Sequence, residues 1–424
     1  MARAASTPCG DEHAMPDQPI LLARQPIYDA ALNVVAFELL YRAISPDAAE
    51  VRDGDEASSR VLLSAFGGAG IMDVTDGKPA FINFTKHLII NPPPVDPQHL
   101  VVEVLEDVVV TPELLDSVRR LRAQGYRIAL DDFQHHPSLE PLVELADIVK
   151  LDVLELGEVQ MRAEVRQLRN YPLRLLAEKI ESWEMFNQCV DLGFSYFQGY
   201  FLARPQLLRG RRAAPARPAL AALMTQLADP DIGIGELAAT VSADPVLSFS
   251  LIRLINSPLY RRANPIESVR EAIGALGVER VRGWCYLLVL ARLGGKPSEL
   301  TRIAMRRARF CELLGEIATG TMPGRCFTAG ILSTLDAFMD EELDTVVDSM
   351  SLSGELRAAL LRREGCMGAV LDTALAFETA SWERVPWRVL AAHGIDQQAA
   401  EQAYLDSLHW ASETLGGLDD GALS

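Results

Sequence analysis

The segments RIALDDF (127–133) and DIVKLD (147–152) decide the fold of the first half of the chain. Each contains a short apolar run, which is typical of a strand buried on both faces, and each carries acidic residues at or near its end. Eight such runs lie between Pro19 and Pro205, with helical patterns between several of them. The other six are LLARQPI (21–27), VVAFELLYR (34–42), AFINF (80–84), LVVEV (100–104), LRLLAEK (173–179) and SYFQGYF (195–201). Because strands alternate with helical crossovers, we predict a parallel (β/α)8-type barrel over residues 19–204.

One of these crossovers has clear helix boundaries. In TPELLDSVRRLRAQG (111–125), Thr111 offers an N-cap, Pro112 takes the first helical position and Gly125 supplies the stop. This segment therefore predicts a helix between two strands of the barrel.

The second half of the chain has a different character. Residues 205–218 are rich in proline and arginine, which predicts a linker. Residues 219–412 lack strand alternation and contain repeated helix-length segments with a 3.6-residue apolar period, so we predict an all-α domain there. We expect residues 1–18 to form a disordered extension and residues 413–424 a frayed tail.

Composition limits the function classes. The chain has 424 residues and a formal net charge of −18, which argues against a nucleic-acid polymer as partner, because such a partner requires a basic face. The six cysteines form no CxxC pair, which is typical of reduced thiols in the cytoplasm. We find no apolar signal region at the start and no apolar run long enough to span a bilayer. We therefore predict a cytoplasmic protein without a membrane span.

Acidic residues fall at or near the carboxyl ends of the predicted strands, where barrels carry their chemistry. They are Glu38, Glu103, Asp131, Asp132 and Glu178, and Asn83 and Lys150 lie at equivalent places. Taken singly, each is equally typical of an edge charge, a turn cap or a surface lysine. Together, five carboxylates at one mouth would repel each other strongly unless cations were bound. An all-oxygen ligand set favours two Mg²⁺ or Mn²⁺ ions over zinc.

These motifs carry a family resemblance. Residues 19–205 resemble the EAL domain, the phosphodiesterase module that opens the bacterial second messenger cyclic di-GMP. The family's EALLR resembles ELLYR (38–42), its asparagine matches Asn83, and its ExxE pair matches Glu103 and Glu106. Its DDF, KLD, AEGVE and QGY motifs resemble DDF (131–133), KLD (150–152), AEKIE (177–181) and QGY (198–200).

The resemblance implies a role for each matched residue. The implied ligands of a two-metal site are Glu38, Asn83, Glu103, Asp131, Asp132 and Glu178. Lys150 would orient or deprotonate the attacking water, assisted by Gln198 and Glu181. Arg42 and Gln25 would bind the substrate, and Glu106 would brace the loop after the fifth strand. Two cations in such a site would activate the water and stabilise the phosphoryl transition state.

Two departures from the family pattern concern catalysis. Residues 134–140 read QHHPSLE, where the family has a glycine-rich loop that shapes the metal site and the dimer contact. A proline-containing loop cannot adopt the same turns with positive φ. Lys179 also replaces the glycine of AEGVE. His135 and His136 are interpreted either as extra ligands or as plain surface groups.

Residues 219–412 resemble the HDOD domain, a helical relative of HD-type metallophosphohydrolases. The resemblance rests on Asp244-Pro245, on Asn256-Ser257-Pro258 and on Ala272-Ile273 leading to Leu276-Gly277. Where an HD enzyme has its His-Asp pair, this chain has Ser333-Thr334, so we expect no metal hydrolysis there. The resemblance implies a regulatory or protein-binding module.

Three hypotheses follow. The first is an enzyme that hydrolyses cyclic di-GMP to the linear dinucleotide pGpG. The second is a weak or inactive EAL domain that acts as a cyclic di-GMP receptor. The third is a scaffold whose HDOD half recruits a protein partner. A homodimer through the EAL domain is compatible with all three.

Overall fold

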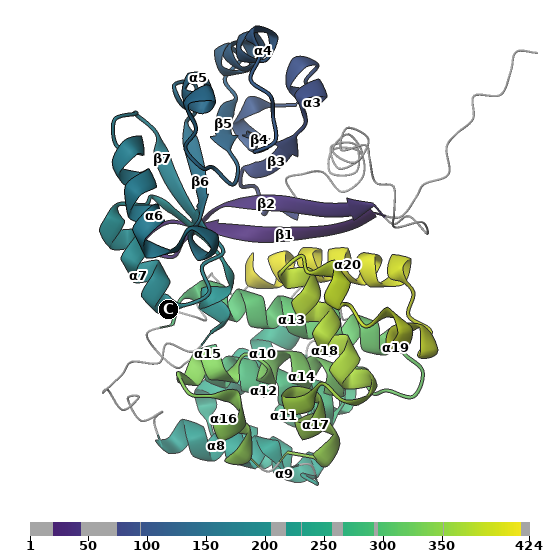
Figure 1. Ribbon diagram of the computed structural model, residues 1–424. Coiled ribbons are helices and arrows are strands. Elements are labelled where there is room, and N and C mark those ends of the chain that lie inside the picture. The colour runs from purple at the N-terminus through teal and green to yellow at the C-terminus, as the bar shows by residue number, and fades with distance from the viewer. Residues whose placement is uncertain are drawn as a thin grey trace, which may run out of the picture.

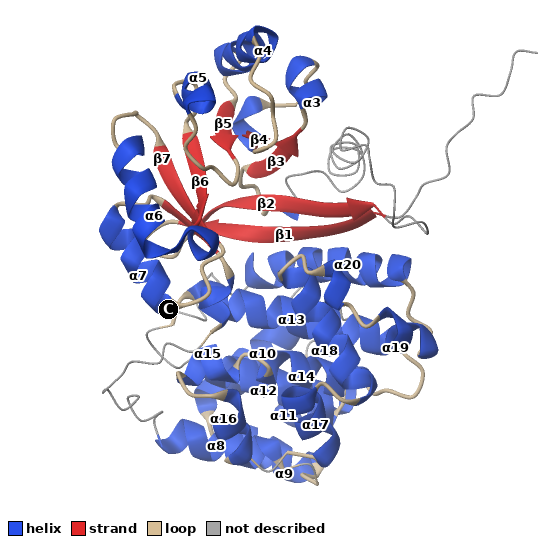
Figure 2. Ribbon diagram, viewed as in Figure 1, coloured by secondary structure: helices blue, strands red, loops and turns tan. Residues whose placement is uncertain are grey.

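The computed structural model describes residues 20–43, 74–93, 95–204, 218–229, 231–256, 266–291, 296–350 and 352–416. Two halves lie one above the other, a barrel with helices around it and an all-helical bundle (Figures 1 and 2). The predicted extension at 1–18 and most of the predicted linker lie outside the described residues, as do residues 417–424 of the predicted tail.

The first half is a closed barrel of eight strands in sequence order, β1 to β8. The strands are β1 (Ile20–Tyr28), β2 (Val34–Ala43), β3 (Ala80–Phe84), β4 (Leu100–Val104), β5 (Arg127–Leu130), β6 (Ile148–Asp152), β7 (Arg174–Glu178) and β8 (Tyr196–Gln198). From β2 to β8 each strand runs parallel to the next, as predicted. Strand β1 is antiparallel to both β2 and β8, so the prediction of an all-parallel barrel is wrong for this strand.

The short link between β1 and β2 explains this direction. A parallel pair needs a long crossover, whereas the chain has only residues 29–33 between these strands. The Asp29 side chain accepts hydrogen bonds from the backbone N–H groups of Ala31 and Asn33, which holds the tight turn. The two strands therefore form a hairpin whose far part extends beyond the barrel (Figure 1).

Helices cover the outside of the parallel strands. Helix α4 begins after Thr111, whose hydroxyl accepts a hydrogen bond from the Leu114 N–H at 3.2 Å, as the sequence predicts. The α-helices of this half are α3 (Lys86–Ile90), α4 (Pro112–Ala123), α5 (Glu140–Val143), α6 (Val153–Leu168) and α7 (Trp183–Leu192). Short 3-10 turns are η1 (Pro97–His99), η2 (Pro137–Leu139) and η3 (Tyr200–Ala203). The buried faces of the α-helices pack against Leu, Ile, Val and Phe side chains of the strands.

Every described element after residue 217 is helical, in agreement with the prediction. The first seven are α8 (Pro218–Ala228), α9 (Ile234–Ser242), α10 (Pro245–Ile255), α11 (Val269–Leu276), α12 (Val278–Ala291), α13 (Ser298–Ile317) and α14 (Pro323–Leu332). The others are α15 (Leu335–Met339), α16 (Leu343–Asp348), α17 (Gly354–Arg362), α18 (Gly365–Glu378), η5 (Trp382–Arg384), α19 (Trp387–Ala392) and α20 (Gln397–Gly416). Aromatic rings of Phe310, Phe377 and Tyr404 meet in the bundle core.

The two halves are joined by direct contacts. The β1–β2 hairpin lies over α20 (Figure 1), where the Arg24 N–H donates to the Tyr404 hydroxyl at 3.2 Å. Below the last barrel strand, Arg307 of α13 donates to the Tyr200 hydroxyl at 2.8 Å. Within the described part of the chain, no helix combines the length and the apolar composition that a bilayer span requires.

Candidate active site

Strand alternation builds the site on top of an apolar layer inside the barrel. Successive residues of a strand point to opposite faces, so residues two apart point the same way. On six strands, a buried apolar residue of the barrel interior is followed two positions later by a polar one. These pairs are Ala36 and Glu38, Phe81 and Asn83, Val101 and Glu103, Ala129 and Asp131, Ile148 and Lys150, and Leu176 and Glu178. The apolar layer closes the barrel and leaves the polar side chains together at its mouth.

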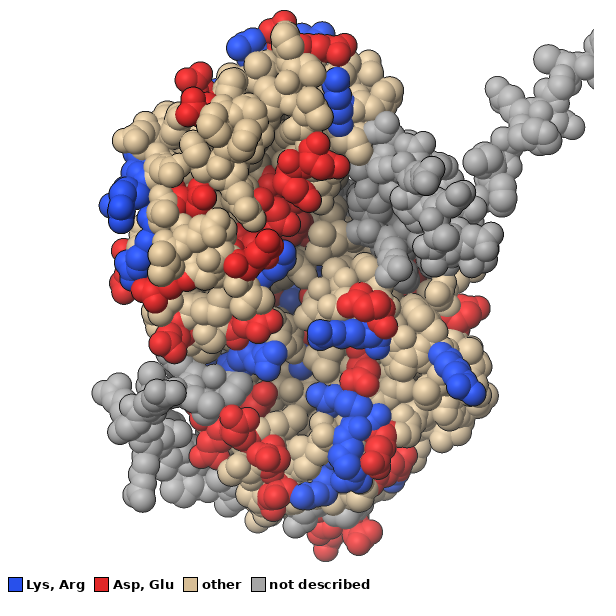
Figure 3. All heavy atoms as spheres, in the orientation of Figure 1, with Lys and Arg blue, Asp and Glu red and all other residues tan. Residues whose placement is uncertain are grey.

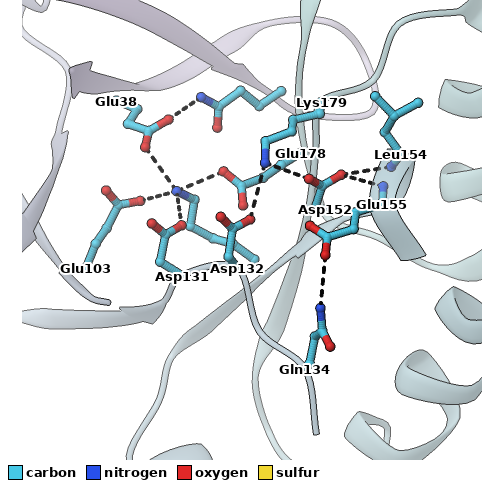
Figure 4. A network of polar contacts seen from close by, with 12 residues as sticks. Glu38, Glu103, Asp131, Asp132, Gln134, Asp152, Leu154, Glu155, Glu178 and Lys179 are labelled. Atoms are coloured by element: carbon cyan, nitrogen blue, oxygen red, sulfur yellow. Dashed lines mark hydrogen bonds and ion pairs between the residues drawn. The ribbon is translucent and has the colours of Figure 1, made fainter. Parts of the chain in front are cut away.

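The ammonium of Lys150 lies among four carboxylates of this polar layer. Figure 4 shows the side chains of these four acids pointing toward one another. The Nζ of Lys150 is 3.1 Å from Glu38 Oε1, 2.6 Å from Glu103 Oε1, 2.7 Å from Asp131 Oδ1 and 2.9 Å from Glu178 Oε1. Lys150 and Glu103 are fully buried. Four carboxyl groups therefore share one ammonium group. The buried acidic groups outnumber the buried basic group at this site.

Burial and the neighbouring charges shift the pKa values of these groups. Burial raises the pKa of Glu178 to about 8, against the attraction of Lys150. Burial also raises the pKa of Glu103 well above its usual value. Burial by itself lowers the pKa of Lys150, but the surrounding carboxylates outweigh it, so this pKa lies well above its usual value. The surrounding carboxylates thus favour the charged form of Lys150, while burial disfavours the ionised forms of Glu103 and Glu178.

Several oxygens of the site fit a divalent cation. Glu38, Glu103 and Asp131 each offer an oxygen, and these three atoms lie within 4.8 Å of one another. Asn83 Oδ1, Glu103 Oε2 and Glu178 Oε2 are buried and accept no hydrogen bond from the described residues. Buried acceptors without donors are costly, and a hard cation would satisfy them. The donor set is all oxygen, which suits Mg²⁺ or Mn²⁺ better than zinc.

Asp132 lies apart from this group. It follows Asp131 with a φ of 39° and faces the ammonium of Lys179, whose Nζ is 3.6 Å from Asp132 Oδ1 and 2.6 Å from Asp152 Oδ2. Asp152 also caps α6, because its Oδ1 accepts the N–H groups of Leu154 and Glu155 at 2.9 Å. Sequence reasoning noted Lys179 only as a missing glycine and gave Asp152 no role.

Gln198 closes the opposite side of the polar layer. Its Nε2 donates to Glu38 Oε2, and to Gln25 Oε1 at 2.9 Å. The next residue, Gly199, has a φ of 151°, and a Cβ there would lie 2.1 Å from the carbonyl oxygen of Ile180. This close approach requires glycine and fixes where Gln198 points. Gln198 and Gln25 thus lie beside Glu38 at the barrel mouth.

Three sequence-predicted residues lie farther out. Glu181 is exposed and lines the large cavity described below. Glu106 is exposed in the turn after β4 and lines a small pocket with Gln134 of the altered loop. Arg42 lies on β2, but its side chain is outside the described residues.

The altered loop is anchored to helix α6. Gln134 Nε2 donates to Glu155 Oε1 at 3.5 Å, and the His135 N–H donates to Glu164 Oε2 at 3.3 Å. The ring of His136 pairs with the Ser138 hydroxyl at 2.7 Å. Neither histidine belongs to the group of metal-compatible residues that the described part of the chain contains.

A cavity of about 990 Å³ connects this mouth to the helical half. Its lining includes the barrel acids on one side and residues of α13, α18 and α20 on the other, among them Arg306, Arg307 and Tyr404. On the face seen in Figure 3, acidic side chains form a band across the barrel half, and basic side chains meet it at the boundary between the halves. The sequence did not reveal that the helical half forms a wall of this cavity.

The helical half satisfies its own polar groups at the position of the missing His-Asp pair. The Ser333 hydroxyl donates to the Gly330 carbonyl at 2.7 Å and accepts from Arg307 Nη1 at 2.8 Å. The Thr334 hydroxyl donates to the Ile331 carbonyl. Among the described residues, the metal-compatible group lies in the barrel and not in this half.

Comparisons with known proteins match both halves of the chain. The EAL domain matches residues 71–205, and the HDOD domain matches residues 215–347. The uncharacterized protein YuxH of Bacillus subtilis is 31% identical over 402 residues, which are 92% of this chain and 98% of the relative. The cyclic di-GMP phosphodiesterase CdgJ of Vibrio cholerae is also 31% identical over 402 residues, covering 92% of each chain. The solved calcium and cyclic di-GMP complex of Klebsiella pneumoniae BlrP1 is 23% identical, with a TM-score of 0.37, over 45% of this chain and 57% of that one. The chain belongs to the family that joins an EAL domain to an HDOD domain.

Proposed function

We propose that the barrel is a cyclic di-GMP phosphodiesterase that produces pGpG with the help of Mg²⁺ or Mn²⁺. The observation that supports this most is the cluster of Glu38, Glu103, Asp131 and Glu178 around Lys150 at the end of a large cavity. A buried excess of carboxylates is unfavourable for stability, so its presence favours a role in binding cations. The relative CdgJ is named as an enzyme of this activity.

In the proposed reaction, the oxygen of a water molecule attacks one phosphorus atom of the cyclic dinucleotide. The bond from that phosphorus to the 3′ oxygen breaks, the 3′ hydroxyl takes up a proton, and the 5′ phosphate remains on pGpG. A divalent cation, when bound, supplies Lewis-acid activation of water and charge stabilisation. Glu38, Asn83, Glu103 and Asp131 would hold it, with Asp132 and Glu178 as the expected ligands of a second ion.

Lys150 would orient the water and balance the charge that develops. The surrounding carboxylates raise the pKa of Lys150 well above its usual value, which favours an ammonium that donates hydrogen bonds, and deprotonation of the water by Lys150 is the alternative role. Gln198 would hold Glu38 in place, and Gln25 would contact the substrate beside it. We also propose that Arg42 binds the substrate, that Glu181 assists at the rim and that Glu106 braces the loop at 134–140.

The helical half would act as a regulatory or partner-binding module. This proposal is supported by its contacts with the barrel, the hydrogen bond from Arg307 to Tyr200 among them, and by its share of the cavity wall. A partner or ligand that moves this half would change access to the barrel mouth. We propose a cytoplasmic location, where cyclic di-GMP is made and degraded, and leave a homodimer through the EAL domain as an expectation.

A receptor function is the second candidate. The loop QHHPSLE at 134–140 favours it, because the loop lacks the glycines that shape the family's metal site. In that case the domain binds cyclic di-GMP and releases it unchanged. The third candidate function is that of a scaffold that recruits a protein partner through the helical half alone.

The test is incubation of the purified full chain with cyclic di-GMP and Mg²⁺ or Mn²⁺, with binding and product followed in parallel. Formation of pGpG that EDTA abolishes supports the enzyme. Tight binding without product over many hours overturns it in favour of the receptor. Asp131→Asn removes a ligand at nearly constant shape and should abolish product, whereas Asp116→Asn on the exposed face of α4 should not.

A further inference from the structure

The cavity between the two halves contains two basic residues without an acidic partner. Seven basic residues line this cavity, and five of them form ion pairs with carboxylates. The paired residues are Arg24, Lys179, Arg306, Arg307 and Arg363. The other two, Arg204 and Arg384, form no ion pair with any residue that the structure describes. Their guanidinium groups are therefore available to a ligand in the cavity.

Arg204 belongs to the barrel half and follows directly after η3. Its N–H donates to the Phe201 carbonyl at 3.1 Å, and its carbonyl accepts from Trp183 Nε1 at 3.3 Å, so its backbone is fixed. Its side chain is exposed, and the guanidinium carbon lies 5.5 Å from the centre of the Tyr200 ring. Burial raises the pKa of Asp336, and Arg204 is one of the groups that oppose this rise without forming an ion pair. The barrel half thus presents a cation from a fixed backbone position.

Arg384 lines the same cavity from the helical half, at the end of the turn η5. Its N–H donates to the Ser381 carbonyl at 2.9 Å. The buried ring of Trp382 in this turn packs edge-on against Phe377, with the ring centroids 5.0 Å apart. The turn is therefore anchored in the core of the helical half, while the side chain of Arg384 is exposed.

A cyclic dinucleotide requires positive charge at two places. Its two phosphates carry a negative charge each and lie on opposite sides of its ring, so one phosphate at the metal-compatible acids leaves the other elsewhere in the cavity. The cavity of about 990 Å³ is at the upper end of the range of small-molecule pockets, about 300–1,000 Å³, and has room for the rest of such a ligand. Guanidinium groups match the geometry of phosphate oxygens and bind them in pairs of hydrogen bonds.

We propose that Arg204 and Arg384, one from each half of the chain, bind the non-reacting phosphate of cyclic di-GMP. This inference rests on cyclic di-GMP as the ligand of the proposed function, and it adds two binding residues to that site. The ligand then contacts both halves, and its binding depends on the position of the helical half against the barrel.

Affinity measurements test the proposal for an enzyme and for a receptor alike. The dissociation constant of cyclic di-GMP is measured for the full chain by equilibrium dialysis in Ca²⁺, and the recovered ligand is checked for integrity. Arg204→Gln and Arg384→Gln should each weaken binding about tenfold, because each removes charge-assisted hydrogen bonds. Any hydrolysis in Mn²⁺ should show a raised KM with an unchanged kcat, because these contacts are the same in the ground state and the transition state.

Conservative and distant variants serve as controls. Arg204→Lys and Arg384→Lys keep a cation and should retain most of the affinity. Arg119→Gln on α4 and Arg325→Gln on α14 remove arginines that do not line the cavity and should change the affinity by less than about twofold. Wild-type affinity in either cavity glutamine variant, lysine variants as weak as the glutamine variants, or a lower kcat at constant KM would overturn the proposal. Absence of cyclic di-GMP binding to the wild type would instead contradict the proposed function.

Discussion

Replacement of Lys150 by methionine removes the cation that four carboxylates share. The Nζ atom lies 2.6–3.1 Å from these carboxylates, and Lys150 is fully buried. Loss of one partner of a buried ion pair costs about 3–5 kcal/mol, because the remaining charges stay unpaired. For a domain of this size, we expect the unfolding transition of the barrel to fall by roughly 6–20 °C in EDTA at pH 8.

The pH dependence follows from the same contacts. Burial raises the pKa of Glu178 to about 8, so this group is largely protonated at pH 6, and burial also raises the pKa of Glu103 well above its usual value. Fewer unpaired charges then remain in Lys150→Met, and we expect the loss of stability to be smaller at pH 6 than at pH 8. Saturating Mg²⁺ should recover part of the loss, about 2.7 kcal/mol at 100 times the dissociation constant.

Calorimetry of both proteins at pH 6 and pH 8, with EDTA or with Mg²⁺, measures these differences. Lys86→Met is the matched control, because Lys86 is exposed and its distance to Glu113 is 3.9 Å, and its effect should stay below about 0.5 kcal/mol. With metal present, Lys150→Met should reduce hydrolysis by roughly 10²–10⁴-fold. A loss of less than about 1 kcal/mol that is equal at both pH values would refute our account of the charge cluster.

Four further predictions test separate parts of the site. Asp131→Asn should abolish the rise in thermal stability that Mg²⁺ gives the wild type, as seen by calorimetry with and without metal; an unchanged rise would place the ion elsewhere. In EDTA, protonated Glu178 stabilises the fold at low pH, and this stability is lost as the pH rises from about 4.5 to about 8. Glu178→Gln should therefore flatten the dependence of the unfolding temperature on pH and should be the more stable protein above pH 8. Parallel pH profiles for the two proteins would contradict the raised pKa of Glu178. Gly199→Ala should lower the unfolding temperature and weaken cyclic di-GMP binding, because its Cβ would overlap the Ile180 carbonyl; a wild-type melting curve would show that the backbone yields there. A glycine-rich loop in place of residues 134–140 should raise the rate of hydrolysis, and an unchanged rate alongside tight ligand binding would favour the receptor hypothesis.

The sequence predicted the polar layer because alternation and strand ends are local properties. Each of Glu38, Glu103, Asp131 and Glu178 follows a short apolar run, and a closed barrel then brings such ends together. The direction of β1 was predicted wrongly, although the five residues between β1 and β2 allow only a hairpin. Helical periodicity likewise sufficed for the second half, in which every described element is a helix.

Long-range placement could not be predicted in the same way. Nothing local indicates that Lys179 reaches Asp152, which is 27 positions earlier in the chain, or that Lys150 contacts Glu38 from a strand on another side of the barrel. The contact between Arg307 and Tyr200, which links the two halves, depends on how separate domains pack. These features follow from tertiary structure, and they determine the electrostatics of the site.

Hydrolysis in water enriched in ¹⁸O tests the central claim most directly. The purified full chain is incubated with cyclic di-GMP and Mn²⁺, and the product is analysed by mass spectrometry. The account predicts pGpG that carries one ¹⁸O atom on its terminal 5′ phosphate, and no product after Asp131→Asn. Cyclic di-GMP recovered intact and unlabelled after prolonged incubation with the wild type would contradict it.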